Sequence, residues 1–455
     1  MKKNLTAITL FFSLSLVFAL PSLEPSVLWG LEENAPLTED APLTEAGALP
    51  GAAPSTSDIS LQEAAPSTSD ISLSKDAPLT SDIPLTRDIP STKTSITQKL
   101  SPRNIISLAL EYSLCPVDSE EGLLSLKKYD LLEKSAAKQF GNMDKTEAAE
   151  KLLLFLHEGA LFSYREDAAK MNQTLLTGEY NCVTASILYL ALAKSLQIET
   201  VVQETDIHAY CSVFLEGQKI DVETTNPYGF NPGQKKLVAQ SQNSRKYAVI
   251  PKKYYSGNRQ VSDLAAATLT GKNLAAMLND TGGYEKAIPL EISRLKLLER
   301  HSDPETKTAR NDLDTLACNH AIALNRRTRP EEALDFLEEV IKTFGTTASL
   351  QKTYGNSLYN ACVNLLNENR DTQALELFEK RRSLADQTMQ TRTKNMIDGQ
   401  MKKKHEITVH NQVVPLFNSG KYEQVLEILQ KALEQNPASG LLKKDLQAVK
   451  KALGQ

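Results

Sequence analysis

The chain of 455 residues lacks several features that mark common protein classes. It has one tryptophan and only five cysteines, and this odd number leaves at least one thiol unpaired in an oxidising compartment. Beyond the N-terminus, no apolar run approaches the ~20 residues of a membrane-spanning helix, which excludes a multi-span membrane protein. The net charge is -5, so the chain has no basic surplus of the kind that nucleic-acid-binding domains carry.

The first residues are typical of an export signal. Lys2 and Lys3 precede an apolar run over 5–20, and Val17-Phe-Ala19 ends in a small residue where a signal peptidase would cleave. No cysteine follows the run, so a lipoprotein anchor is not expected. The sequence predicts a signal peptide over 1–19 and a periplasmic or secreted protein, with an uncleaved anchor as the alternative.

Residues 20–100 are predicted to be a disordered acidic linker. The stretch from Leu31 to Leu100 contains no Phe, Tyr or Trp, and it carries eleven acidic and four basic residues. The segment Ala53-Pro-Ser-Thr-Ser-Asp-Ile-Ser-Leu61 recurs unchanged at 65–73. Such a composition buries too little apolar surface to offset its ordering entropy. The first 30 residues contribute a net +1, which leaves residues 101–455 with a net charge of +1.

Helices are expected over 102–114, 120–140 and 146–164, and the most informative segment follows them. Gly178-Glu-Tyr-Asn-Cys182 leads into a stretch to residue 196 that is apolar on nearly every face, which predicts a buried central helix. Asn181 is a good N-cap, so Cys182 would occupy the first helical position. Free backbone N–H groups and the helix dipole stabilise a thiolate at that position, so it suits a nucleophile.

A hairpin is predicted after this helix. Strands are expected over 200–203, 208–215 and 219–224, and a two-residue turn at Glu216-Gly217 would place Cys211 opposite Val222. The apolar residues then share one face. The other face would carry the polar members of both strands: His208, Tyr210, Ser212, Asp221, Glu223 and Thr225.

This register offers His208 a carboxylate partner. Extending the pairing puts Thr225 opposite His208, so Glu223 is a diagonal neighbour at roughly 7–8 Å between backbones. Asp221 would lie about 13 Å away at ~3.3 Å per residue. We therefore prefer Glu223 as the orienting acid and retain Asp221 as the alternative, since a bulge or a longer turn would change the choice.

The order of these features resembles the transglutaminase-like superfamily. The Cys182 motif, the apolar helix, His208 at the start of a strand and an acid on the next strand match that family over about residues 145–235. The resemblance implies a papain-like α+β fold, with Cys182 as nucleophile, His208 as base and then acid, and Glu223 as orienting acid. Members commonly end the third motif with Asp-Pro-Thr, where this chain has Glu223-Thr-Thr225. They also often carry an aromatic residue next to the histidine, where this chain has Ala209.

Each candidate also has a simpler interpretation. Cys182 could be a buried structural thiol and His208 a strand-end histidine without chemistry; their order and spacing together favour catalysis. A metal site made by Cys182, His208 and Cys211 matches no usual zinc spacing. The sequence predicts no cofactor.

Residues 258–455 are predicted to form an all-α array of helix pairs. Four similar segments align Ala287, Ala333, Ala374 and Val425, at spacings of 46, 41 and 51 residues. They resemble degenerate tetratricopeptide repeats, whose usual period is 34, and 439–453 would be a capping helix. Such an array either binds a peptide or protein partner in its groove or buttresses the cysteine domain.

Together these features predict a disordered N-terminal segment, an α+β transglutaminase-like domain over 101–257 and the repeat array. We expect an exported cysteine enzyme that acts on peptide or amide bonds by acyl transfer. The likeness to bacterial members favours hydrolysis. The alternative is a non-catalytic envelope scaffold that binds proteins through its repeats.

Overall fold

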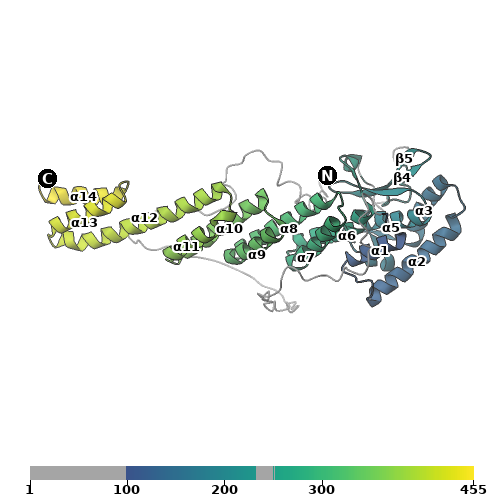
Figure 1. Cartoon of the computed structure of the whole chain (residues 1–455), viewed down its shortest axis with the longest axis horizontal. Coiled ribbons are helices and arrows are strands. Elements are labelled where there is room, and N and C mark those ends of the chain that lie inside the picture. Colours follow the sequence, from purple (N-terminus) through teal and green to yellow (C-terminus); the bar gives the residue numbers. More distant parts are fainter. Residues whose placement is uncertain (1–98, 232–249, 251) are drawn as a thin grey trace, which may run out of the picture. The chain divides into compact units, whose positions relative to one another are not determined.

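A computed structural model describes residues 99–231, 250 and 252–455. The predicted signal peptide and acidic linker lie outside these residues. The described part of the chain is mainly helical, with fourteen α-helices and six short strands (Figure 1). None of its helices is long and apolar enough to cross a membrane.

The first three helices each begin at a polar side-chain cap. α1 (Pro102–Glu111), α2 (Glu120–Phe140) and α3 (Lys145–Gly159) are capped by Ser101, Ser119 and Asp144. α1 ends earlier than predicted because Leu114 has a positive φ of 56° and Pro116 follows. α3 also ends early, at Gly159, and the chain beyond it forms a strand.

A small parallel pair of strands leads into the central helix. β1 (Ser163–Tyr164) pairs with β2 (Glu179–Tyr180), and α4 (Met171–Thr177) connects them. Gly178 ends α4 in the left-handed conformation, with a φ of 74°. α5 (Cys182–Ser195) then starts at the residue that the sequence predicts, and all residues from Thr184 to Ala193 are buried.

A four-stranded antiparallel sheet packs on α5. Its order is β5 (Gln218–Val222), β4 (Ala209–Leu215), β3 (Thr200–Glu204) and β6 (Arg259–Val261). β3 and β4 contact α5 (Figure 1). In the hairpin, Cys211 pairs with Val222 and Val213 with Ile220, which is the register that the alternation of the two strands predicts.

The sheet extends past residue 257, where the sequence predicts the cysteine domain to end. β6 covers the edge of β3 that β4 leaves unpaired. The Glu204 carboxylate at the end of β3 accepts hydrogen bonds of 2.8 Å from Arg259 of β6 and from Lys272. Lys272 lies in α6 (Asp263–Asp280), which packs against both α1 and α5.

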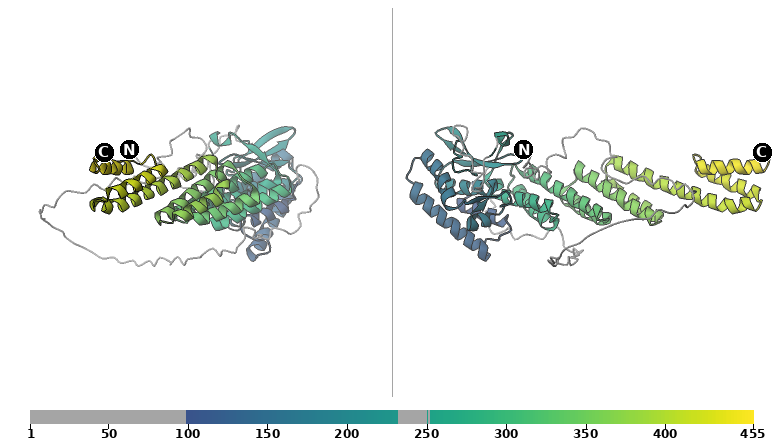
Figure 2. Two further views of the ribbon diagram at one scale, coloured as in Figure 1. Left: turned by 60° about the vertical axis from the view of Figure 1, so that its left-hand side comes forward. Right: turned by 180° about the vertical axis from the view of Figure 1, so that it is seen from behind.

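The remaining helices form an all-α array that can be followed from green to yellow in Figure 2. Its members after α6 are α7 (Tyr284–Arg300), α8 (Thr306–Arg326), α9 (Pro330–Phe344), α10 (Ala348–Asn367), α11 (Asp371–Arg381), α12 (Gln387–Asn418), α13 (Tyr422–Gln435) and α14 (Gly440–Ala452). Two short 3₁₀ helices, η3 (Lys252–Tyr255) and η4 (Arg382–Leu384), complete the described elements.

The four aligned small residues occupy equivalent places in this array. Ala287, Ala333, Ala374 and Val425 lie in the first turns of α7, α9, α11 and α13, and all four are buried. Each helix packs against the helix before it. The spacings are long because α8, α10 and α12 have 21, 20 and 32 residues.

The hairpin turn allows a direct test of the register. Glu216 and Gly217 have φ values of 49° and 77°, and a Cβ added at Gly217 would meet no atom within 4 Å. Gly217→Ala should lower the free energy of unfolding by about 1 kcal/mol through backbone strain alone. Glu216→Asn should raise it by about 0.5 kcal/mol, because Asn-Gly suits this turn. The measurement is the urea unfolding midpoint of each variant. If both substitutions shifted the midpoint in the same direction, the proposed two-residue turn at Glu216-Gly217 would be contradicted.

Candidate functional site

Cys182 stands at the N-terminus of α5 with its side chain partly exposed. Asn181 fixes this end of the helix, because its Oδ1 accepts from the N–H groups of Val183 and Thr184 at 3.0 and 3.1 Å. Among the described residues, the N–H of Cys182 itself has no hydrogen-bond acceptor. The thiol and this free N–H are therefore available at the same point.

His208 comes immediately before β4, and its side chain is buried. Its Nε2 lies 2.8 Å from Oε2 of Glu223, so the ring donates to the carboxylate. The backbone carbonyl of His208 accepts from the N–H of Thr205 at 2.8 Å, which holds the strand end in place. An interaction with the Cys182 side chain contributes to the raised pKa of His208.

Glu223 follows β5 directly and is completely buried. Its Oε1 accepts from the N–H and the hydroxyl of Thr225, at 3.1 and 2.7 Å. Its Oε2 accepts from His208 and from the Tyr255 hydroxyl. Four donors thus surround one carboxylate, which is how a buried charge is tolerated.

The loop that carries Glu223 is anchored to three other elements. His157 of α3 contacts the Thr224 carbonyl at 3.0 Å, and the Tyr180 hydroxyl of β2 donates to the Thr225 carbonyl at 3.2 Å. The hydroxyls of Ser186 in α5 and Thr224 are 2.8 Å apart. The acid is therefore held by the body of the domain rather than by the hairpin alone.

Because of this loop, the pairing does not continue to His208 as the sequence predicts. The ladder stops at Cys211 and Val222, and the Glu223 N–H donates instead to the Gly229 carbonyl at 2.9 Å. A Cβ at Gly229 would lie 2.0 Å from the Glu223 carbonyl oxygen, so only glycine fits there. Thr225 consequently contacts Glu223 rather than facing His208.

Two tyrosines and an asparagine that the sequence does not single out as site residues enclose the pair. The Tyr255 ring meets the His208 ring edge-on at 5.7 Å, and Tyr210 stacks on His208 at 6.1 Å. Asn258 donates to the Tyr210 hydroxyl at 2.8 Å and to the Tyr255 carbonyl at 3.1 Å. Tyr255 and Asn258 lie more than 30 residues after Glu223, so no local pattern connects them with it.

Each member of the pair shifts the pKa of the other. Burial alone would lower the pKa of His208, but the negative charge of Glu223 and the interactions of the ring with Cys182 and Glu223 raise it to about 10. Burial opposes ionisation of Glu223 as well, yet the charge of His208 and the hydrogen bonds that the carboxylate accepts hold the pKa of Glu223 below its ordinary value. Both shifts favour an imidazolium paired with a carboxylate.

Tyr164 of β1 is half-buried. Burial raises the pKa of Tyr164, and the charges of Cys182, Glu166 and Glu223 raise it further. Its ring also meets Tyr180 edge-on at 5.7 Å. The Tyr164 hydroxyl is therefore neutral and able to donate a hydrogen bond.

Of the residues selected from the sequence, the structure brings His208 and Glu223 into hydrogen-bond contact, and it places Cys182 at the N-terminus of α5. It does not bring Asp221 to them, because its Oδ1 accepts from the Ser212 hydroxyl at 2.7 Å on the outer part of the hairpin. Cys211 faces the core and donates to the Ser186 carbonyl at 3.3 Å. No three His, Cys, Asp or Glu side chains among the described residues are grouped so that they could hold a metal.

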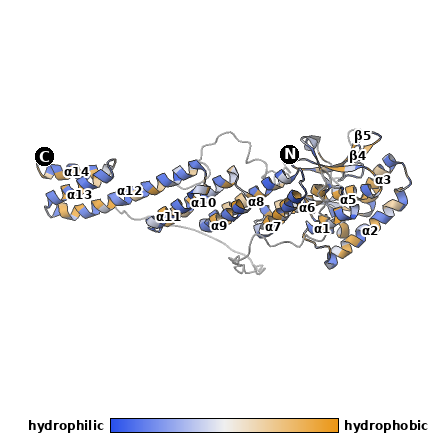
Figure 3. Ribbon diagram, in the orientation of Figure 1, coloured by the Kyte–Doolittle hydropathy of each residue, from blue (hydrophilic) through white to orange (hydrophobic). Residues whose placement is uncertain are grey.

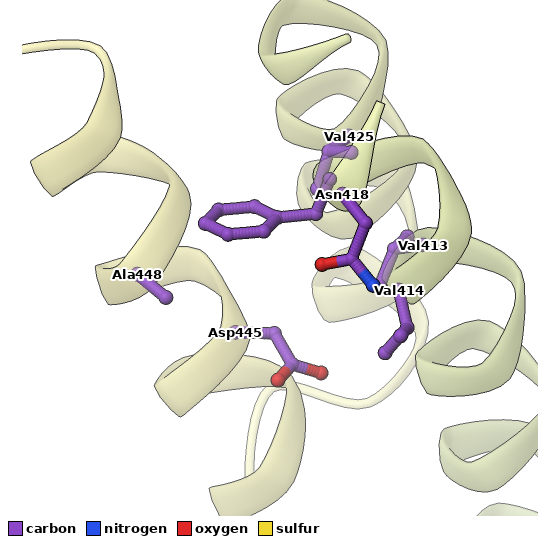
Figure 4. A pocket seen from close by; sticks show the side chains of 7 residues that line it. Val413, Val414, Asn418, Val425, Asp445 and Ala448 are labelled. Carbon is purple, nitrogen blue, oxygen red and sulfur yellow. The ribbon is translucent and has the colours of Figure 1, made fainter. Parts of the chain in front are cut away.

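A cavity of about 120 Å³ lies among α12, α13 and α14 (Figure 4). Its lining is mostly apolar, and the Asp445 carboxylate at its edge is 2.7 Å from His410. The lining comprises Val413, Val414, Phe417, Asn418, Val425, Asp445 and Ala448. None of these side chains is a nucleophile beside a base, so the cavity offers contacts but no reactive group.

Replacing each of the two candidate acids should have a different effect on the pKa of His208. In Glu223→Gln the charge that raises the His208 pKa is lost and burial dominates, so this pKa should fall from about 10 to below the ordinary 6.5. In Asp221→Asn it should stay near 10. Ring-carbon NMR shifts of ¹³C-labelled histidine measure both, since the chain has only six histidines. A fall in Asp221→Asn alone would contradict the geometry.

Tyr255→Phe tests the remaining donor. It leaves a buried carboxylate oxygen with one hydrogen bond fewer, so the free energy of unfolding should fall by about 1–3 kcal/mol. The matched control is Tyr254→Phe, whose ring lies near Lys253 at 5.2 Å and outside the site. Equal losses in the two variants, measured by urea unfolding, would mean that the Tyr255 hydroxyl contributes nothing to Glu223.

No family model matches the chain, and no curated protein matches it. Among solved structures, the chain is similar to the crystal structure of menin that reveals its binding site for the Mixed Lineage Leukemia protein. The superposition covers 60% of this chain and 73% of menin, with 11% sequence identity and a TM-score of 0.28. So slight a similarity establishes neither a shared fold nor a shared function.

Proposed function

We propose that the protein is an exported, transglutaminase-like cysteine enzyme that transfers acyl groups from peptide or amide bonds, with hydrolysis as the favoured outcome. The observation that carries the proposal is the buried hydrogen bond between His208 and Glu223, in a domain whose central helix begins at a cysteine. The chain order of these residues and the strands that follow the cysteine helix support the resemblance to this family and its papain-like fold.

The raised pKa of His208 favours a reaction that starts from the protonated ring. A protonated ring beside Cys182 stabilises a thiolate, which is the attacking form of cysteine. The sulfur attacks the carbonyl carbon, and the C–N bond breaks as His208 gives its proton to the leaving amine. The neutral ring then takes a proton from water, which attacks the thioester and releases the acid and the thiolate.

Glu223 acts on this reaction only through the histidine. Its carboxylate holds Nε2 of His208, so the other ring nitrogen is the one left for Cys182. It also stabilises the imidazolium that the first step consumes and the second restores. Thr225 and Tyr255 keep the carboxylate oriented and ionised.

Developing charge on the carbonyl oxygen would be stabilised by the backbone of Cys182. The free N–H of Cys182 lies at the positive end of α5, the usual place for such a donor. The same donor would serve transfer to water or to an amine.

The helical array would bind a peptide or protein partner through tetratricopeptide-like pairs. The apolar cavity among α12, α13 and α14 favours a contact surface at that end, because its lining is mainly valine and phenylalanine. The same observation supports the second candidate function, a scaffold that binds proteins without catalysis. Reactivity of Cys182 separates the two.

Alkylation by iodoacetamide at pH 6, followed by peptide mapping, tests the enzyme proposal. Cys182 of the unmodified protein should react rapidly, because its thiolate is stabilised by His208. In His208→Ala the rate should fall about a hundredfold, to that of an ordinary thiol at this pH. Cys318 is the internal control: it is also partly exposed, but burial raises the pKa of its thiol, so it should react slowly in both proteins.

A second variant, Glu223→Gln, conserves the volume of the side chain. It therefore shows whether a slow alkylation in His208→Ala comes from the lost interaction or from misfolding. It should slow the alkylation of Cys182 as well, while circular dichroism remains that of the parent protein. Equal and slow rates at Cys182 and Cys318 in the unmodified protein would contradict an activated thiol and leave the scaffold.

A further inference from the structure

We infer that the outer face of α2 is a docking surface for anionic lipid headgroups. This α2 outer face is defined by three leucines and three lysines: Leu123, Leu124, Leu131, Lys127, Lys128 and Lys134. At 3.6 residues per turn they fall within an arc of about 140°. The inference concerns a different surface from the cysteine site and does not rest on the proposed function.

The leucines are exposed well beyond what packing requires. The exposed fractions of Leu123, Leu124 and Leu131 are 58, 54 and 56%. These are the largest values among the exposed large hydrophobic residues of the described chain. The opposite side of α2 buries its other apolar residues, among them Leu126, Tyr129 and Phe140, against α1, α3, α4 and α5. Folding therefore buries one apolar face of α2 and leaves the three leucines of the opposite face exposed to solvent.

The lysines on this face are not neutralised by the acids of the same helix. Glu121 accepts from the Asn172 amide at 2.7 Å, Asp130 pairs with Arg103 at 3.3 Å, and Glu133 accepts from Tyr129 at 3.2 Å. Glu120 and Lys138 both fall within the same arc and are exposed, so their opposite charges offset each other and the three lysines set the net charge of the face. Lys127, Lys128 and Lys134 are all exposed, and no ion pair within the described residues involves them.

This mixture fits a lipid surface better than a protein partner. The leucines and lysines are intermixed over the same arc, whereas a protein groove favours an apolar stripe with charges at its rim. On a bilayer, leucines enter the headgroup region while lysines extend toward phosphates, so both kinds of side chain are satisfied at once. Figures 1 and 2 show α2 along the outer side of the α1–α5 group, and Figure 3 shows hydrophobic and hydrophilic residues intermixed along it.

Vesicle co-sedimentation of the full chain tests the inference. The protein should partition onto vesicles of phosphatidylcholine and phosphatidylglycerol in equal amounts, and not onto phosphatidylcholine alone. The triple variant Lys127→Gln, Lys128→Gln and Lys134→Gln should bind about a hundredfold more weakly, at roughly 1 kcal/mol for each lysine. Leu124→Ser with Leu131→Ser should also weaken binding, and neither variant should change the circular dichroism.

A matched control removes equal charge elsewhere. The control is the triple variant Lys402→Gln, Lys403→Gln and Lys431→Gln, at exposed positions of α12 and α13. It should leave the partitioning onto vesicles unchanged. No binding to anionic vesicles, or an equal loss in the two lysine triples, would overturn the inference. So would a dissociation of dimers in the leucine variant, seen by sedimentation equilibrium, because a second copy would then cover this face.

Discussion

One buried carboxylate determines the geometry of the site. Glu223 lies in a region from which water is excluded, so its charge must be balanced by nearby donors. Those donors come from its own loop, from the strand end at His208 and from the 3₁₀ helix at Tyr255. Because the charge of Glu223 is balanced by all of these donors together, the loop, the strand end and the 3₁₀ helix are held in one arrangement although they are distant in the chain. The same negative charge raises the pKa of His208.

The cysteine is aligned with this pair by ordinary packing. α5 is apolar around its whole circumference, and the sheet lies on it through β3 and β4. Cys211 of β4 and Thr224 of the loop both bond to Ser186, one turn into α5. These two bonds therefore fix the position of the first turn of α5, which contains Cys182, along the hairpin. The start of α5 and the loop that carries Glu223 are therefore joined through Ser186.

Much of this could be predicted from local patterns. The N-cap at Asn181, the buried helix after it and the alternation of the two hairpin strands were sufficient for the register and for the choice of Glu223 over Asp221. The reason behind that choice was incomplete, because the ladder ends at Val222 and the loop, not the pairing, brings the acid to His208. Tyr255 and Asn258 could not be found, since their contacts are tertiary and follow no periodicity. The strand Arg259–Val261 was too short to give a signal.

The sharing of α6 between sheet domain and array has a consequence for how this chain can be divided. One side of α6 covers α1 and α5, another side meets α7, and its lysine binds the last residue of β3. Severing the chain after residue 257 would strip the sheet of an edge strand and bare two core helices. The sheet domain and the first helices of the array thus share one hydrophobic core, whereas the helices from α9 onward build cores of their own. A cut after residue 257 would therefore damage the shared core first.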